Sequence, residues 1–108
     1  MPSYEEKCIE WFEKNQTKGQ VLVKVAKEIE SYTCGWNNGW TEAMTNKIGG
    51  YFILKKELFN YLSSTGILLL TKDCLNKEEL KNFKDDPKQH YYYPIECFDI
   101  ITQCEYKK

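Results

Sequence analysis

The first sixteen residues carry apolar side chains at helical spacing. The apolar positions follow i, i+4, i+7 and i+8, which is one face of a helix, and are Tyr4, Cys8, Trp11 and Phe12. Ser3 followed by Glu6 has the spacing of a capping box at the start of a helix. The pattern predicts a helix over residues 1–16 whose apolar stripe packs on the core. The alternative is that this stripe forms the contact of a dimer.

Alternating and β-branched positions dominate the segments that follow. Residues 20–30 place Val21, Val23 and Val25 at every second position, and such side chains favour the pleated surface of a strand. Further β-prone runs cover residues 51–54, 67–71, 90–93 and 97–102. These runs are separated by turn signals such as Asn-Gly and Asp-Pro. They predict about five short strands.

Short helical patterns lie between the strands. Residues 41–47 predict one short helix with Met44 pointing inward. Residues 76–83 predict another, because Asn is followed three residues later by Glu, as at a helix cap. Residues 55–62 fit either a strand or a helical insertion. The sequence therefore predicts an α+β, mainly β fold: a small β-barrel of about five strands, an N-terminal helix and a short helical insertion.

Composition is that of one small globular domain. The chain has 108 residues, of which 42% are hydrophobic and 15% aromatic, so wholesale disorder is excluded. No linker, repeat or low-complexity tract divides it, and we expect a single domain over residues 1–108. The longest apolar run, residues 66–70, is far too short to cross a bilayer, and the N-terminus lacks the pattern of a signal peptide. We expect a cytoplasmic protein without a membrane partner.

Charge disfavours general nucleic-acid binding. The net charge is −1, and all 15 basic residues are Lys, with no Arg in the chain. Arg is the preferred side chain for phosphates and guanine edges, and nucleic-acid binding normally needs a basic surplus. A small phosphate site built from Lys and backbone amides stays compatible with this composition.

The cysteines indicate a reducing compartment. There are five, an odd number, with no Cys-x-x-Cys pair, and His90 is the only histidine. This set argues against both a disulfide framework and a zinc site, so we expect no cofactor. Most of these thiols are expected to be small buried hydrophobes. A hydrolase or transferase that pairs His90 with a reactive Cys is the enzymatic alternative, although no nucleophile elbow or phosphate-binding loop is present.

Clustered aromatic residues are the strongest candidates for ligand binding. Two Trp flank an Asn-Gly turn and three Tyr stand in a row; alternation places Tyr91 and Tyr93 on one face of a strand and Tyr92 on the other. Flat aromatic surfaces bind bases and peptides by stacking. The candidate ligand-binding residues are Trp36, Asn38, Trp40, Tyr91, Tyr92 and Tyr93. The structural alternative is that both Trp and Met44 close the ends of a barrel.

The spacing of the central region resembles a known group of proteins. The outline is Ser-Tyr-x-x-Gly-Trp, Trp-x-x-x-Met, Ile-Gly and Tyr-Tyr-Pro, carried by Ser31, Tyr32, Gly35, Trp36, Trp40, Met44, Ile48, Gly49, Tyr92, Tyr93 and Pro94. It resembles a group of small, mostly uncharacterised phage and bacterial proteins. The resemblance implies an SH3-like β-barrel over residues 20–104, with an insertion near residues 75–89. The helix of residues 1–16 has no counterpart in that outline.

The resemblance implies a non-enzymatic binding module. Its expected role is that of a phage-type accessory or counter-defence protein in the host cytoplasm. It would bind a host protein, or sequester a small nucleotide signal with Trp or Tyr stacked on the base. The alternatives are the Cys/His-dependent enzyme and a structural or assembly protein that oligomerises through the N-terminal helix.

Overall fold

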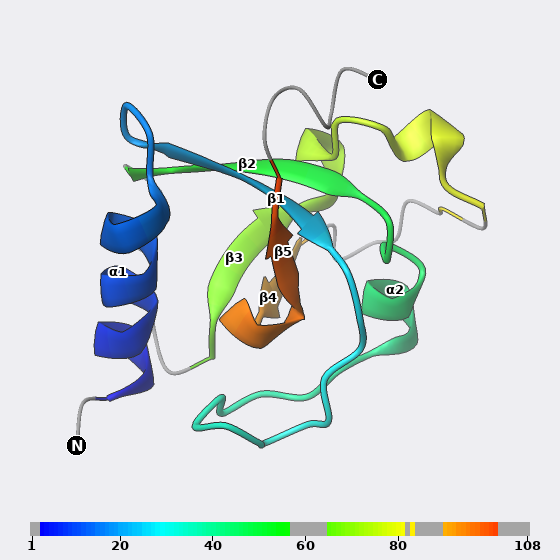
Figure 1. Cartoon of the computed structure of the whole chain (residues 1–108). Helices are drawn as coiled ribbons and strands as arrows, with labels where there is room; N and C mark the ends of the chain where they lie inside the picture. Colours follow the sequence, from blue (N-terminus) through cyan, green and yellow to red (C-terminus); the bar gives the residue numbers. More distant parts are fainter. Residues whose placement is uncertain (1–2, 57–64, 82, 84–89, 102–108) are drawn as a thin grey trace.

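A computed structural model describes residues 3–56, 65–81, 83 and 90–101 (Figure 1). The helices are α1 (Tyr4–Asn15) and the single turn α2 (Glu42–Thr45). The strands are β1 (Gln20–Val25), β2 (Tyr51–Lys55), β3 (Ile67–Leu70), β4 (His90–Tyr93) and β5 (Phe98–Ile100). Within the described residues, 3₁₀ turns cover Thr71–Asp73, Lys77–Glu79 and Ile95–Cys97. The sequence-based predictions for residues 57–64, 84–89 and 102–108 lie outside the described residues.

Helix α1 forms as its sequence predicts. The Ser3 hydroxyl accepts a hydrogen bond from the Glu6 amide at 3.2 Å, and the two acidic residues of the first turn suit the positive end of the helix dipole. The stripe faces inward: Tyr4, Cys8 and Phe12 are buried, and the helix stands beside the sheets (Figure 1). The half-buried stripe residue, Trp11, stacks on Phe98 of β5 with ring centroids 6.0 Å apart.

The described strands form two antiparallel sheets. Strand β1 lies in the middle of the first sheet, between β2 and β5, and Val23 stands opposite both Phe52 and Ile100. The second sheet pairs β3 with β4, from Ile67 opposite Tyr93 to Leu70 opposite His90. The structure is thus a small α+β fold, and no pairing among the described strands joins the two sheets into a closed barrel.

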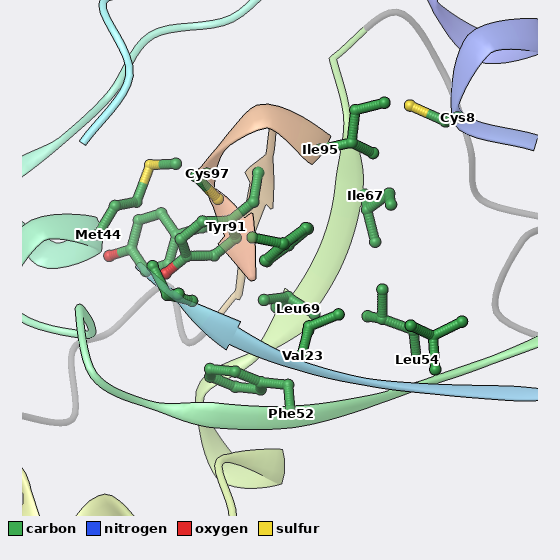
Figure 2. Packing of buried hydrophobic residues seen from close by; sticks show 14 of the residues in the cluster. Cys8, Val23, Met44, Phe52, Leu54, Ile67, Leu69, Tyr91, Ile95 and Cys97 are labelled. Atoms are coloured by element: carbon green, nitrogen blue, oxygen red, sulfur yellow. The ribbon is translucent and has the colours of Figure 1, made fainter. Parts of the chain in front are cut away.

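The core collects one face of each sheet. Burial alternates along the strands, as expected for sheets with one face turned to the interior. Figure 2 shows side chains of both sheets meeting Met44 of α2 and Cys8 of α1 in one cluster. The inward orientation of Met44 confirms the prediction from its position in the sequence.

Strand β1 is shorter than the sequence predicts. The prediction of a strand over residues 20–30 is wrong beyond Val25, the last residue of β1. The backbone of Val25 is hydrogen-bonded to Gly49 and Gly50, and the Ala26 amide donates a hydrogen bond to the Cys97 carbonyl. The chain then leaves the sheet, because charged residues with helix or loop preference replace the β-branched ones.

The predicted helix over residues 76–83 is also wrong. A 3₁₀ turn, Lys77–Glu79, stands at its start, and the Asn76 side chain does not cap it. The side-chain amide of Asn76 instead accepts a hydrogen bond from the backbone N–H of Tyr51 at 2.9 Å and donates one to the Gly49 carbonyl at 3.1 Å. These long-range hydrogen bonds compete with the local cap.

Other strand ends also differ from the prediction. The strand predicted over residues 67–71 ends at Leu70, because Thr71 begins a 3₁₀ turn. The strand predicted over residues 97–102 begins at Phe98, since Cys97 belongs to the turn that follows Pro94. That strand also ends at Ile100, so the prediction is wrong at Ile101 as well. These differences lie at element boundaries, where sequence patterns are weakest.

A buried phenol attaches α1 to the turn before β5. The Tyr4 hydroxyl donates to Glu96 Oε1 at 2.7 Å and accepts from the Ile95 amide at 2.8 Å. Lys7 Nζ lies 2.9 Å from Glu96 Oε2. Burial, followed by the Glu96 carboxylate, raises the pKa of the Tyr4 phenol well above its usual range.

Replacing Tyr4 tests this attachment. We expect Tyr4→Phe to lower the free energy of unfolding by about 1–3 kcal/mol, because it leaves buried hydrogen-bonding groups without a partner. Since the folded state raises the pKa of Tyr4, its contribution is complete below the ordinary tyrosine pKa of about 10 and is lost as the pH rises above it. Urea denaturation across that range measures both effects. Tyr32→Phe, at an exposed side chain, is the control; equal stability of the two variants would contradict the assignment.

Candidate functional site

Trp36, the first predicted site residue, belongs to the core. Its side chain is only 1% exposed, and its indole Nε1 donates to the Thr65 carbonyl at 2.6 Å. The backbone at Gly66 packs so closely that an added Cβ would clash with the Tyr93 carbonyl and lie 2.9 Å from the Trp36 nitrogen. The indole therefore has no exposed surface on which a ligand could stack.

The three tyrosines of β4 alternate as the sequence predicts. Tyr91 and Tyr93 are buried, whereas Tyr92 is half-buried on the other face. Tyr92 stands edge-on to His90, with ring centroids 6.3 Å apart. The buried pair contributes to the core, so the outer face of β4 presents Tyr92 and His90.

Trp40 joins the core to the surface. It packs edge-to-face against Trp36 and Tyr93, with ring centroids 6.4 and 5.8 Å away. Its indole Nε1 donates to Thr45 Oγ1 at 2.8 Å. Asn38, the remaining predicted residue, is half-buried in the loop, and its carbonyl accepts from the Tyr32 amide at 3.0 Å.

An open groove of about 610 Å³ lies beside Trp40. Two segments line it: residues 28–31, which follow β1, and residues 40–42 together with Thr45, which belong to α2 and its entry. Of the six predicted site residues, Trp40 is the one that lines this groove. The structure therefore separates the predicted aromatic set, most of which packs inward, from the concave surface.

Hydrogen bonds fix the groove from both sides. The Ser31 hydroxyl accepts from the Trp40 amide at 2.8 Å, which ties the two lining segments together. Thr45 Oγ1 accepts from the Trp40 indole and donates to Glu28 Oε1 at 3.0 Å. Hydrogen bonds thus connect an aromatic side chain, a hydroxyl and a carboxylate in series. Because these contacts lie within the protein, the groove is formed before any ligand binds.

Helix α2 is too short to be stable alone and is held by its surroundings. The Thr41 hydroxyl accepts from the Met44 amide at 3.3 Å, and Met44 is buried. Lys47, 2% exposed, donates from Nζ to the Ala43 carbonyl at 3.2 Å. Its ammonium lies 4.9 Å from the ring centroid of Tyr91, within cation–π distance. These contacts give the α2 wall of the groove a fixed position.

The loop next to the groove is braced in a strained conformation. Tyr32 and Cys34 have φ values of 59° and 58°, in the left-handed region that non-glycine residues rarely adopt. The Thr33 hydroxyl donates to the Glu30 carbonyl at 2.7 Å, and the Trp36 amide donates to the Thr33 carbonyl. The loop presents Tyr32 with 70% of its side chain exposed.

The groove is acidic. Three carboxylates line it, those of Glu28, Glu30 and Glu42, and no Lys or His does. Across the described part of the chain the one ion pair is Lys7–Glu96, so these three acids have no basic partner there. Nor does any group of three His, Cys, Asp or Glu side chains within the described ranges have the arrangement needed to hold a metal ion.

Sequence reasoning missed these acids. Glu28 and Glu30 lie within residues 20–30, which the sequence predicts as one strand, and charged residues on a strand normally face solvent. The signal that could have located them is the run Glu-Ile-Glu-Ser-Tyr directly after the last β-branched residue, with Trp-Thr-Glu following the loop. The spacing alone does not place the two runs opposite each other.

Burial suppresses thiolate formation at three of the cysteines. It raises the pKa of the Cys8 thiol to about 12 and also raises the pKa values of Cys74 and Cys97. Thiols of this kind are poor nucleophiles at neutral pH. Cys34 is exposed, and Cys104 lies outside the described residues.

Comparison of the chain with protein-family models, curated proteins and solved structures gives no match. No helix in the described ranges has the length and apolar character required to span a membrane.

Paired substitutions test whether the predicted aromatic residues are structural. We expect Trp36→Ala to lower the free energy of unfolding by about 3–5 kcal/mol, because it empties a filled core position. Tyr92→Ala, on the outer face of β4, should cost about 1 kcal/mol or less. Thermal and urea denaturation measure both. A similar decrease in the free energy of unfolding for both variants would show that Trp36 is no more important to the core than Tyr92.

Thiol labelling reads the burial of each cysteine separately. With iodoacetamide at pH 8 and mass mapping of the peptides, we expect Cys34 to react and Cys8, Cys74 and Cys97 to be protected until urea is added. Because burial raises the pKa of Cys8 to about 12, raising the pH from 8 to 10 should leave Cys8 protected. Rapid native labelling of Cys8 or Cys97 would instead support a nucleophilic cysteine.

Proposed function

We propose that this chain is a non-enzymatic protein-binding module that acts on a host protein in the cytoplasm, as a phage-type accessory or counter-defence protein. It binds through the groove face, defined as residues 28–32, 40–42 and Thr45. The observation that carries the proposal is the groove itself: a concave, braced surface with Trp40 in its wall, next to the exposed Tyr32 that follows the lining residue Ser31 in the chain.

The strand pairings support the proposed SH3-like barrel. In a five-stranded barrel of this type the first strand pairs with the second and the last, which matches β1 with β2 and β5. The third and fourth strands also pair, as β3 and β4 do. A β2–β3 pairing would complete the barrel; residues 56–66 connect these two strands, which are not paired with each other.

Exposed aromatic residues on a rigid support favour a protein partner. Tyr and Trp are enriched at protein interfaces because they bury a large apolar area and keep a polar tip. Tyr32 is held in a strained backbone conformation and is 70% exposed. Strain of this kind persists at positions where function selects it.

The charge of the groove favours a protein over a nucleotide. A nucleotide signal would bring phosphates, which three carboxylates repel. Three of the five aromatic candidates for stacking on its base, Trp36, Tyr91 and Tyr93, are buried. The raised thiol pKa values likewise give the enzymatic alternative no support.

Site-specific photocrosslinking in the cell that naturally contains the protein tests this function. A photoreactive phenylalanine replaces Tyr32 on the groove face or, as a control, Leu75, an exposed apolar residue outside it. We expect position 32 to crosslink one defined host protein and position 75 not to do so. The crosslinked protein is then purified and its binding measured by calorimetry.

The opposite results are equally clear. Crosslinking at position 75 alone, or no crosslink at either position, would contradict the proposed face. Native mass spectrometry provides the second readout. A retained mass of a few hundred daltons that absorbs as a nucleotide would replace the host-protein proposal with sequestration of a small signal.

A further inference from the structure

We propose that the groove recognises a cationic side chain of the partner, an arginine, seated against Trp40 between the glutamates. This inference rests on the proposed function and names the chemistry of that same surface.

The indole of Trp40 provides the first element of such a site. Trp is the aromatic side chain with the strongest attraction for cations, and a guanidinium can also stack on its ring. Trp40 lines the groove while its other contacts, with Trp36, Tyr93 and Thr45, hold the ring in place. A cation that enters the groove therefore meets an aromatic surface without reordering the side chain.

The carboxylates provide the second element. Glu28 is oriented by Thr45, at 3.0 Å, in the same chain of hydrogen bonds that fixes the indole. Glu30 and Glu42 approach from the two lining segments and are exposed. In the described residues none of the three is neutralised by a basic partner, so a bound cation would supply the missing positive charge. Arginine, with several donors in a planar fork, can engage two carboxylates at once.

The shape of the groove indicates how the cation arrives. The groove is open rather than enclosed, and the exposed Tyr32 directly follows the lining residue Ser31 in the chain. An open site leaves room for the main chain that carries the arginine, whereas a free small cation is bound more often in an enclosed pocket. The exposed tyrosine then contacts the partner next to the cation.

Titration with matched small probes tests the inference on the intact protein. The probes are N-acetyl-arginine amide, its neutral isostere N-acetyl-citrulline amide, and free spermidine. The readout is the ¹H–¹⁵N signal of the Trp40 indole, which is identified by its absence in Trp40→Phe. We expect saturable shifts with the arginine probe, about tenfold weaker binding of the citrulline probe, and weaker binding as salt is added.

Two double variants of equal net charge separate local from general electrostatics. Glu30→Gln with Glu42→Gln removes two carboxylates from the groove, and Glu10→Gln with Glu13→Gln removes two exposed ones from α1. We expect the first pair to weaken binding of the arginine probe about tenfold or more and the second pair to leave it within about twofold. Thermal melts confirm that both variants are folded.

Each result bears on the inference or on the function beneath it. Equal binding of arginine and citrulline, no shift at Trp40, or equal loss in both double variants would overturn the cation site. If position 32 still crosslinks a host protein, the binding function survives that failure. Tight spermidine binding without any crosslinked protein would instead overturn the protein partner in favour of a free polyamine.

Discussion

The indole of Trp36 is the constraint on which the binding surface depends. Its indole nitrogen donates a hydrogen bond to the carbonyl of Thr65, just before β3, and its ring packs against Trp40. The chain at Gly66 has room for no side chain between this indole and Tyr93. One side chain thus fixes the segment after β1 against both strands of the second sheet. The groove is a consequence of that attachment, because its aromatic wall lies directly on the core.

Local signals predicted the helices and strands wherever nothing distant competed with them. Ser3 and the apolar stripe gave α1, and alternation gave the orientation of the β4 tyrosines. The failure at Asn76 has a long-range cause. Asn76 has the sequence signature of a cap, but its amide bonds to Gly49 and Tyr51 across the fold. Strand β1 instead ends at Val25 because charged residues follow its β-branched ones, although the Ala26 amide still donates to the Cys97 carbonyl.

The site was only partly predictable for a different reason. A cluster of aromatic residues has the same sequence whether it faces a ligand or a core, and most of this one faces the core. Trp40 was identified because it does both. The carboxylates of Glu28 and Glu42 become neighbours of one groove only through the Thr45 hydrogen bonds and the position of α2. Such a juxtaposition is a property of the fold, and charges on exposed segments are too common to reveal it.

The order in which the chain is synthesised conflicts with the order of its contacts. The first helix is anchored by Tyr4 to Glu96 and Ile95, and the first strand needs β5 as one of its two neighbours. A nascent chain on the ribosome therefore cannot complete either element until about a hundred residues have emerged from the exit tunnel. Docking of these elements is then a late event governed by non-local contacts, and the early segments stay exposed to chaperones until it occurs.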